Sequence, residues 1–213
     1  MPSNARISVM DPEPPPQDKG GARRRQVLEA AARCFSEHGF RGASIQRICE
    51  AAGMSPGHVY HYFRNKEAIV AGIVEQDLQD TLARIQRMRE RGQNQGVLAA
   101  CLGEVDTGVA RCAGEPARLQ LEILAEANRS PAIAAVLQQA DRLKRDELLA
   151  LLRALPSLRG LSAAELKARV AVMCTLFEGL AVRTLLDPTL DRAATGQAIS
   201  RVVRLLLEQP EET

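Results

Sequence analysis

Residues 44–66 combine hydrogen-bonding side chains with helical spacing. Gln46, His58 and His61 carry amide and imidazole groups, which can pair with the edges of nucleic-acid bases. Hydroxyl and ammonium groups suited to phosphate oxygens stand at Ser44, Tyr60, Tyr62 and Lys66. The segment therefore predicts non-covalent recognition of nucleic acid.

Two short helices joined by a tight turn must position these groups. Ser44 is a good N-cap, and Gly53 supplies the backbone freedom to end the first helix. Ser55 can cap the second helix, and Pro56 suits its first position because the missing N–H costs nothing there. One side of the pair is apolar, with Ile45, Ile48, Ala52, Val59 and Phe63. The other side exposes Gly57, His58, His61 and Tyr62, with Tyr60 at its flank.

This segment resembles the DNA-binding domain of the TetR family of bacterial transcriptional regulators. The matching residues stand in the family's order: Ser44, Ile48, Gly53, Gly57, Val59, Tyr60, Tyr62, Phe63, Lys66 and Glu67. Cys49 departs from the pattern by replacing a small alanine, which leaves the fold prediction intact because a thiol is nearly as compact. The resemblance covers roughly residues 22–75 and implies an operator-binding helix-turn-helix.

Chemistry and position in the motif together predict the role of each residue. We expect Ser44, Tyr60, Tyr62 and Lys66 to contact phosphates, and Gln46 and His58 to read bases, with His61 as a third candidate. Gly57 would let the backbone lie close to the groove. The full set of expected DNA contacts is Arg25, Ser44, Gln46, Ser55, Pro56, Gly57, His58, Tyr60, His61, Tyr62 and Lys66. A metal site at His58 and His61 is not expected, since no third ligand is near.

Charge is distributed unevenly along the chain. Residues 19–66 hold nine basic and three acidic side chains, a net charge of +6, which leaves −4 for the rest of a chain whose total is +2. Positive potential on one segment favours contact with phosphate. A solvated charge run at the start of a helix is the alternative for Arg23–Arg25.

Composition and periodicity predict an all-α protein of about nine helices. Aromatic residues make up only 3% of the chain, whereas Ala, Leu, Arg and Glu are abundant. We expect a disordered extension at 1–18, a three-helix helix-turn-helix DNA-binding domain at 19–66, and a larger helical ligand-binding and dimerisation domain at 67–213. The expected helices span about 22–38, 44–52, 55–63, 65–91, 97–112, 116–128, 131–155, 162–186 and 191–208.

The last two helices are expected to form a dimer interface. The helix at 162–186 is apolar on more than one side, and Gly179 would let another helix approach closely. The resemblance implies that these helices pair with their copies as a four-helix bundle across a two-fold axis. Expected interface residues are Met173, Leu176, Gly179, Ile199, Val203 and Leu206. Closure of the subunit's own core is the alternative.

The second domain offers few polar groups for an effector pocket. Expected ligand-binding residues are Met88, Glu122, Glu126, Phe177 and Glu178. Acidic groups inside a cavity would favour a cation, but a solvated face or pairing with arginine is the alternative for Glu122 and Glu126. After Phe63 the only aromatic residue is Phe177, which excludes an aromatic cage within one subunit.

These features predict a ligand-responsive transcriptional regulator, a repressor released from a palindromic operator by a small molecule. We expect a cytoplasmic homodimer bound to double-stranded DNA, with no membrane contact, metal or cofactor. An enzyme is not expected, because the three histidines lie in the first domain without a catalytic pattern. Alternatives are a helical protein-binding adaptor and a thiol-sensing regulator, which would use one of Cys34, Cys49, Cys101, Cys112 and Cys174.

Overall fold

A computed structural model of the chain describes residues 19–208. Within this range the chain forms ten α-helices and one 3₁₀-helix, and no strand. The predicted all-α class is therefore confirmed. The extension expected at residues 1–18 lies outside the described residues.

The first four helices form the amino-terminal half of the fold. They are α1 (Lys19–Gly42), α2 (Ile45–Ala52), α3 (Pro56–Tyr62) and α4 (Lys66–Gln95). Gly39 has φ 68°, so α1 kinks there and continues to Gly42, beyond the end predicted from sequence. Asn65 caps α4 by accepting a hydrogen bond from the Ala68 N–H at 2.8 Å.

Six further α-helices and the 3₁₀-helix make up the rest. They are α5 (Val97–Leu102), α6 (Val105–Arg111), α7 (Gly114–Ala127), α8 (Pro131–Leu152), η1 (Pro156–Leu158), α9 (Ala163–Leu186) and α10 (Arg192–Leu207). The single helix expected at 97–112 is divided into α5 and α6, and Gly103, a poor helix former, lies in the break. Ser162 and Glu165 form a capping box at the start of α9.

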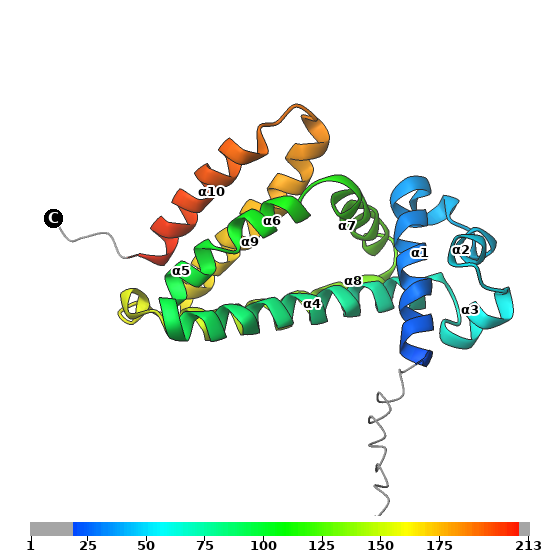
Figure 1. Cartoon of the computed structure of the whole chain (residues 1–213), viewed down its shortest axis with the longest axis horizontal. Helices are drawn as coiled ribbons and strands as arrows, with labels where there is room; N and C mark the ends of the chain where they lie inside the picture. Colours follow the sequence, from blue (N-terminus) through cyan, green and yellow to red (C-terminus); the bar gives the residue numbers. More distant parts are fainter. Residues whose placement is uncertain (1–18, 209–213) are drawn as a thin grey trace, which may run out of the picture.

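The long helices α4 and α8 lie side by side and connect the two ends of the molecule (Figure 1). At one end α1 crosses them, and α2 and α3 lie on the far side of α1 (Figure 1). The helices α5, α6, α9 and α10 gather toward the other end. The helices α2 and α3, which we call the reading helices, are therefore held by α1 and the start of α4.

Two apolar cores stabilise this arrangement. The N-terminal core contains Phe35, Ile48, Val59 and Ile69, whose exposed fractions are 1% or less. Burial of each such side chain contributes about 1.5–3 kcal/mol. The C-terminal core unites the end of α4 with α5, α6, α8, α9 and α10.

The boundary between these cores does not coincide with the domain boundary expected at residue 66. Ile123 of α7 and Ile133 of α8 belong to the N-terminal core. Because these residues come from the second half of the chain, a shift of α7 or α8 would act directly on the packing behind the reading helices. No described helix combines the length and the apolar character needed to cross a bilayer.

Candidate functional site

The two reading helices are capped as the sequence predicts. Ser44 Oγ accepts the Arg47 N–H at 3.1 Å, and Gly53 ends α2 in the left-handed region with φ 62°. Ser55 Oγ accepts the His58 N–H at 3.4 Å, and Pro56 begins α3. Caps at both starts fix the angle of a turn that leaves only three residues between the helices.

One face of this pair packs and the other is exposed. Val59 and Phe63 are buried in the N-terminal core, with exposed fractions of 0% and 3%. Most of the expected DNA contacts are exposed, namely Arg25, Ser44, Gln46, Ser55, Pro56, Gly57, His58, Tyr60 and His61. Tyr62 and Lys66 are half-buried. We call the exposed set, together with Glu50, the reading face.

Packing within the subunit does not explain why position 57 is glycine. A Cβ placed on Gly57 would meet no atom within 4 Å, and its φ is not positive. The absence of a side chain there suits the close approach of a partner from outside. An open hollow of about 620 Å³ lies beside it, lined by Ile45, Gln46, Cys49, Glu50, Gly53, Met54, Pro56 and Tyr60.

Two hydrogen bonds within the reading face orient the predicted base readers. Gln46 Nε2 donates to Glu50 Oε1 at 3.1 Å, one turn further along α2. His58 Nδ1 lies 3.1 Å from Ser55 Oγ. Sequence reasoning missed Glu50, although its spacing of four residues from Gln46 is the signal that could have found it.

Lys66 makes a contact within the chain that the sequence did not predict. Its ammonium donates to the Phe40 carbonyl oxygen at 2.7 Å and lies 4.5 Å from the centre of the Phe40 ring. This contact joins the start of α4 to the end of α1, and the phosphate contact expected of Lys66 stays a prediction. The sequence did not indicate this contact because 26 residues separate the partners.

Side chains of α1 also support the reading helices. Gln26 Nε2 donates to the Ala52 carbonyl oxygen at 2.7 Å, which satisfies the last turn of α2. Arg24 forms an ion pair with Glu75 at 3.0 Å and lies 5.2 Å from the centre of the Phe63 ring. Of the arginine run, Arg24 is therefore structural, while Arg25 stays exposed.

The two acidic residues of α7 that were expected to bind a ligand have partners within the chain. Glu122 Oε2 accepts the Phe40 N–H at 3.4 Å, so this carboxylate contacts the kinked end of α1. Glu126 pairs with Arg129 at 3.3 Å, which was the alternative considered for it. Both carboxylates thus have partners within the chain, and an acidic pocket built on them stays a prediction.

Two of the other three expected ligand residues, Met88 and Phe177, pack against the C-terminal core. Phe177 packs on Gly108 so closely that a Cβ there would lie 2.5 Å from the ring. Glu178 is exposed, and Met88 is half-buried against the C-terminal core. These positions serve packing or solvation in this arrangement.

A different charged cluster joins the helices α4, α6 and α8. Asp77 of α4 pairs with Arg111 of α6 and Lys144 of α8, each at 2.5 Å. Burial alone would raise the pKa of Asp77, but the two cations outweigh it and lower the pKa below its ordinary value. Arg84 lies nearby, and burial, followed by the repulsion of Arg111, lowers its pKa.

The cysteines are in poor surroundings for thiolate chemistry. Burial raises the pKa of Cys101 to about 11 and also raises the pKa of the thiols of Cys34, Cys49, Cys112 and Cys174. Since the thiolate is the reactive form, these shifts disfavour the thiol-sensing alternative.

Three of the six residues that we expected at the dimer interface are buried in α9 and α10. Met173, Ile199 and Val203 are buried in their own subunit, with exposed fractions of 7%, 7% and 1%, and so offer little surface to a second copy. Leu176 and Leu206 are half-buried, and Gly179 is exposed. Large apolar side chains are exposed instead at Val172, Val182, Leu185, Leu186, Val202 and Leu205. We call this exposed set the apolar face.

Comparison with known proteins assigns the chain to a family. The family model described as bacterial regulatory proteins of the tetR family matches residues 27–73, and the one described as the C-terminal part of a BetI-type transcriptional repressor matches residues 109–208. The chain belongs to the TetR family. Both the reading helices and the helices of the apolar face fall inside the matched ranges.

Curated TetR-like relatives match part of the chain. UidR of Escherichia coli K12, an HTH-type transcriptional regulator, is 36% identical over 115 residues, which cover 54% of this chain and 57% of UidR. Rv1474c of Mycobacterium tuberculosis, an HTH-type transcriptional repressor, is 38% identical over 84 residues, covering 39% of this chain and 45% of that protein. The chain thus spans about half the length of the curated relatives it matches.

Solved structures share the TetR fold over most of the chain. GusR of Salmonella enterica has a TM-score of 0.68 at 22% identity, covering 90% of this chain and 96% of GusR. FadR of Bacillus subtilis, solved with stearoyl-CoA, has a TM-score of 0.66 at 17% identity, covering 85% and 97%. SmeT, solved with triclosan, has a TM-score of 0.69 at 22% identity, covering 85% and 90%.

Proposed function

We propose that this TetR-family protein is a ligand-responsive transcriptional regulator that binds double-stranded operator DNA through the reading face. The observation that carries the proposal is an exposed set of amide, imidazole and hydroxyl groups on two capped helices whose other side is buried. In a helix-turn-helix the second helix enters the major groove, and that helix here is α3. Family members named as repressors favour repression.

We propose further that the apolar face joins two copies of the chain. Val182 and Leu186 on α9, and Val202 and Leu205 on α10, present apolar side chains that the subunit itself leaves exposed. Gly179 lies on the same side of α9, and a Cβ there would meet nothing within 4 Å, so a second backbone can approach. Two-fold pairing would offer two α3 helices to successive major grooves, about 34–36 Å apart.

An effector would act by favouring one of two arrangements of the dimer. FadR and SmeT, which share this fold, were solved with stearoyl-CoA and triclosan respectively. This supports a small-molecule effector bound within the second domain, which we propose to span residues 67–213. The contact between Glu122 and Phe40 connects α7 to the end of α1, and Phe40 in turn holds Lys66 at the start of α4. Differential affinity of the effector for the two arrangements would drive release from DNA.

Capture of genomic fragments by the purified protein tests the proposal. Fragments that share a two-fold sequence are expected, and fluorescence anisotropy on that duplex should give an affinity that falls with salt. Recovery of no DNA under low salt, together with specific capture of a protein, would favour the adaptor alternative.

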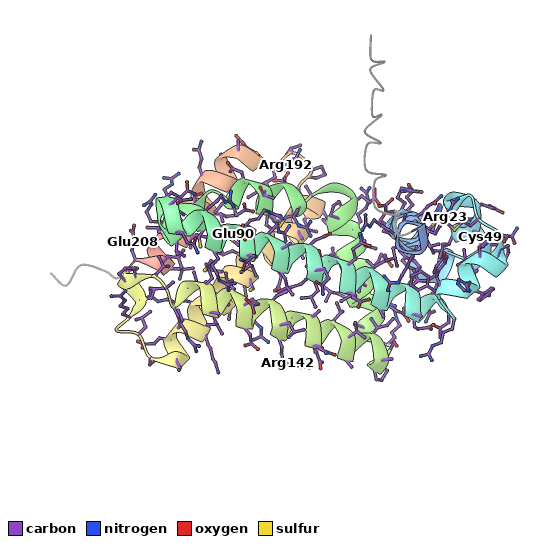
Figure 2. All side chains as sticks on the ribbon, turned by 60° about the horizontal axis from the view of Figure 1, so that its bottom comes forward. Arg23, Cys49, Glu90, Arg142, Arg192 and Glu208 are labelled. Carbon is purple, nitrogen blue, oxygen red and sulfur yellow. The ribbon has the colours of Figure 1, made fainter. Side chains whose placement is uncertain are left out.

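A matched pair of arginine variants then locates the DNA on the protein surface. Arg25 lies on the reading face, and Arg142 is an exposed arginine on α8, away from α2 and α3 (Figure 2). Arg25→Ala should weaken binding on all sequences and reduce the salt slope by about 0.9 for each phosphate that the arginine neutralises, whereas Arg142→Ala should change neither. Equal effects of the two variants would place the DNA elsewhere.

A further inference from the structure

Ser55 makes two contacts with the same residue. Its hydroxyl oxygen caps α3 by accepting the His58 backbone N–H at 3.4 Å, and the same oxygen lies 3.1 Å from Nδ1 of the His58 ring. Both side chains are exposed on the reading face, while Val59 beside them is buried. The base of the His58 side chain is therefore anchored on a rigid helix, and one of its two ring nitrogens is already engaged.

The hydrogen-bonding inventory of these groups limits what the other nitrogen can do. A hydroxyl has one hydrogen and two lone pairs, and a neutral imidazole has one N–H and one lone pair. With one lone pair of Ser55 Oγ taken by the backbone N–H, its hydrogen can be directed at Nδ1. In that arrangement Nδ1 accepts and the proton of the ring resides on Nε2, whereas in the competing tautomer Nδ1–H donates to the remaining lone pair of the hydroxyl.

We propose that Ser55 sets the tautomer of His58 and thereby makes Nε2 a hydrogen-bond donor toward the DNA. The inference rests on the proposed function and names a specificity-determining, positioning residue for it. A donor at this place pairs with the N7 and O6 acceptors of guanine and is opposed by the N4 amino group of cytosine. Ser55 would thus favour guanine over cytosine at one operator position without touching a base.

The substitution Ser55→Asp distinguishes a role in setting the tautomer from a role in capping α3 alone. Aspartate caps a helix about as well as serine, so Ser55→Asp keeps the N-cap. An ionised carboxylate only accepts hydrogen bonds, so Nδ1 must become the donor and Nε2 the acceptor. The preference at the position read by His58 should then move from guanine to a base with a donor, cytosine or adenine. Ser55→Thr keeps both the hydroxyl and the cap and serves as the control.

The test uses the full-length protein and duplexes in which each position of the captured operator is varied. Relative affinities are measured at about pH 8.5, about two units above the ordinary imidazole pKa of about 6.5. The wild type and Ser55→Thr should prefer guanine about tenfold over cytosine at one position, and Ser55→Asp should reverse the order. His58→Ala in each background should remove the preference at that position alone.

A second readout in the free protein separates this inference from the proposed function. Nitrogen-15 NMR of the His58 ring should find the proton on Nε2 in the wild type and on Nδ1 in Ser55→Asp, whether or not either protein binds DNA. The same tautomer in both proteins would overturn the inference, as would a guanine preference that survives Ser55→Asp. Failure of the wild type to bind any duplex, with the two tautomers as expected, would overturn the proposed function instead.

Discussion

The ammonium of Lys66 rests on Phe40, donating to its carbonyl oxygen at 2.7 Å and lying 4.5 Å from the centre of its ring. The Phe40 ring itself lies 5.5 Å from that of Phe35, which is buried in the N-terminal core. One cation therefore ties the start of α4 to the end of α1. The helix α4 follows α3 after three residues, so the contact also limits how α3 can tilt.

Loss of this cation should lower the stability of the whole N-terminal core. Lys66→Ala removes a hydrogen bond from a charged donor and a cation–π contact, so we expect the free energy of unfolding to fall by about 1–3 kcal/mol. Chemical denaturation followed by circular dichroism measures the change. Lys167→Ala, at an exposed lysine of α9, is the control and should leave the midpoint unchanged. An unaltered midpoint for Lys66→Ala would contradict a structural role.

The bond between Glu122 and Phe40 should protect the kinked end of α1. Glu122→Ala leaves the Phe40 N–H without its acceptor, and we expect hydrogen exchange in residues 39–41 to accelerate about fivefold, because removing a hydrogen bond costs about 1 kcal/mol. Mass-spectrometric hydrogen exchange reads this segment directly. Glu126→Ala, one turn later on α7, breaks only the pair with Arg129 and should not change it. Equal exchange in both variants would mean that α7 does not hold α1 through this carboxylate.

An acidic side chain on the apolar face should separate the proposed dimer. Leu205 has 72% of its side chain exposed, so Leu205→Glu costs a lone subunit little but places a charge in a two-fold contact. Sedimentation or light scattering should report monomers, and operator affinity should fall at least tenfold because only one α3 can engage at a time. Leu124→Glu, at a 48% exposed position of α7, provides the comparison. If Leu205→Glu formed dimers of unchanged stability, Leu205 of α10 would not lie in the interface.

Asp77 should make stability depend on pH in a defined direction. The pKa of Asp77 is lowered in the folded protein, so its ion pairs with Lys144 and Arg111 stabilise the fold fully at a pH above 3.8, the ordinary pKa of the carboxyl group. This stabilisation is lost as the pH falls through the lower pKa of the folded state. Because the side chain is 38% exposed, water screens the pairs and we expect Asp77→Asn to cost about 1–2 kcal/mol near pH 7. The difference between wild type and variant should shrink in acid. Asp146→Asn, at an exposed position of α8, should show no such trend.

Local signals allowed most of the helices and the reading face to be predicted. Caps at Ser44, Ser55 and Asn65, and the turn residue Gly53, act within a few residues, so the local sequence alone determines where α2, α3 and α4 begin and where α2 ends. The buried side of α3 followed from Val59 and Phe63 in the same way.

Contacts between distant segments were decided only by the tertiary structure. The helix α9 is apolar on several sides, so periodicity could not tell that Met173 faces the subunit's own core while Val172, its neighbour, is exposed. Glu122 meets Phe40 across 82 residues, and Lys66 meets it across 26, and no local pattern encodes either pairing. Capping and helical periodicity are properties of neighbours along the chain, whereas the partner of a charge depends on how the helices pack.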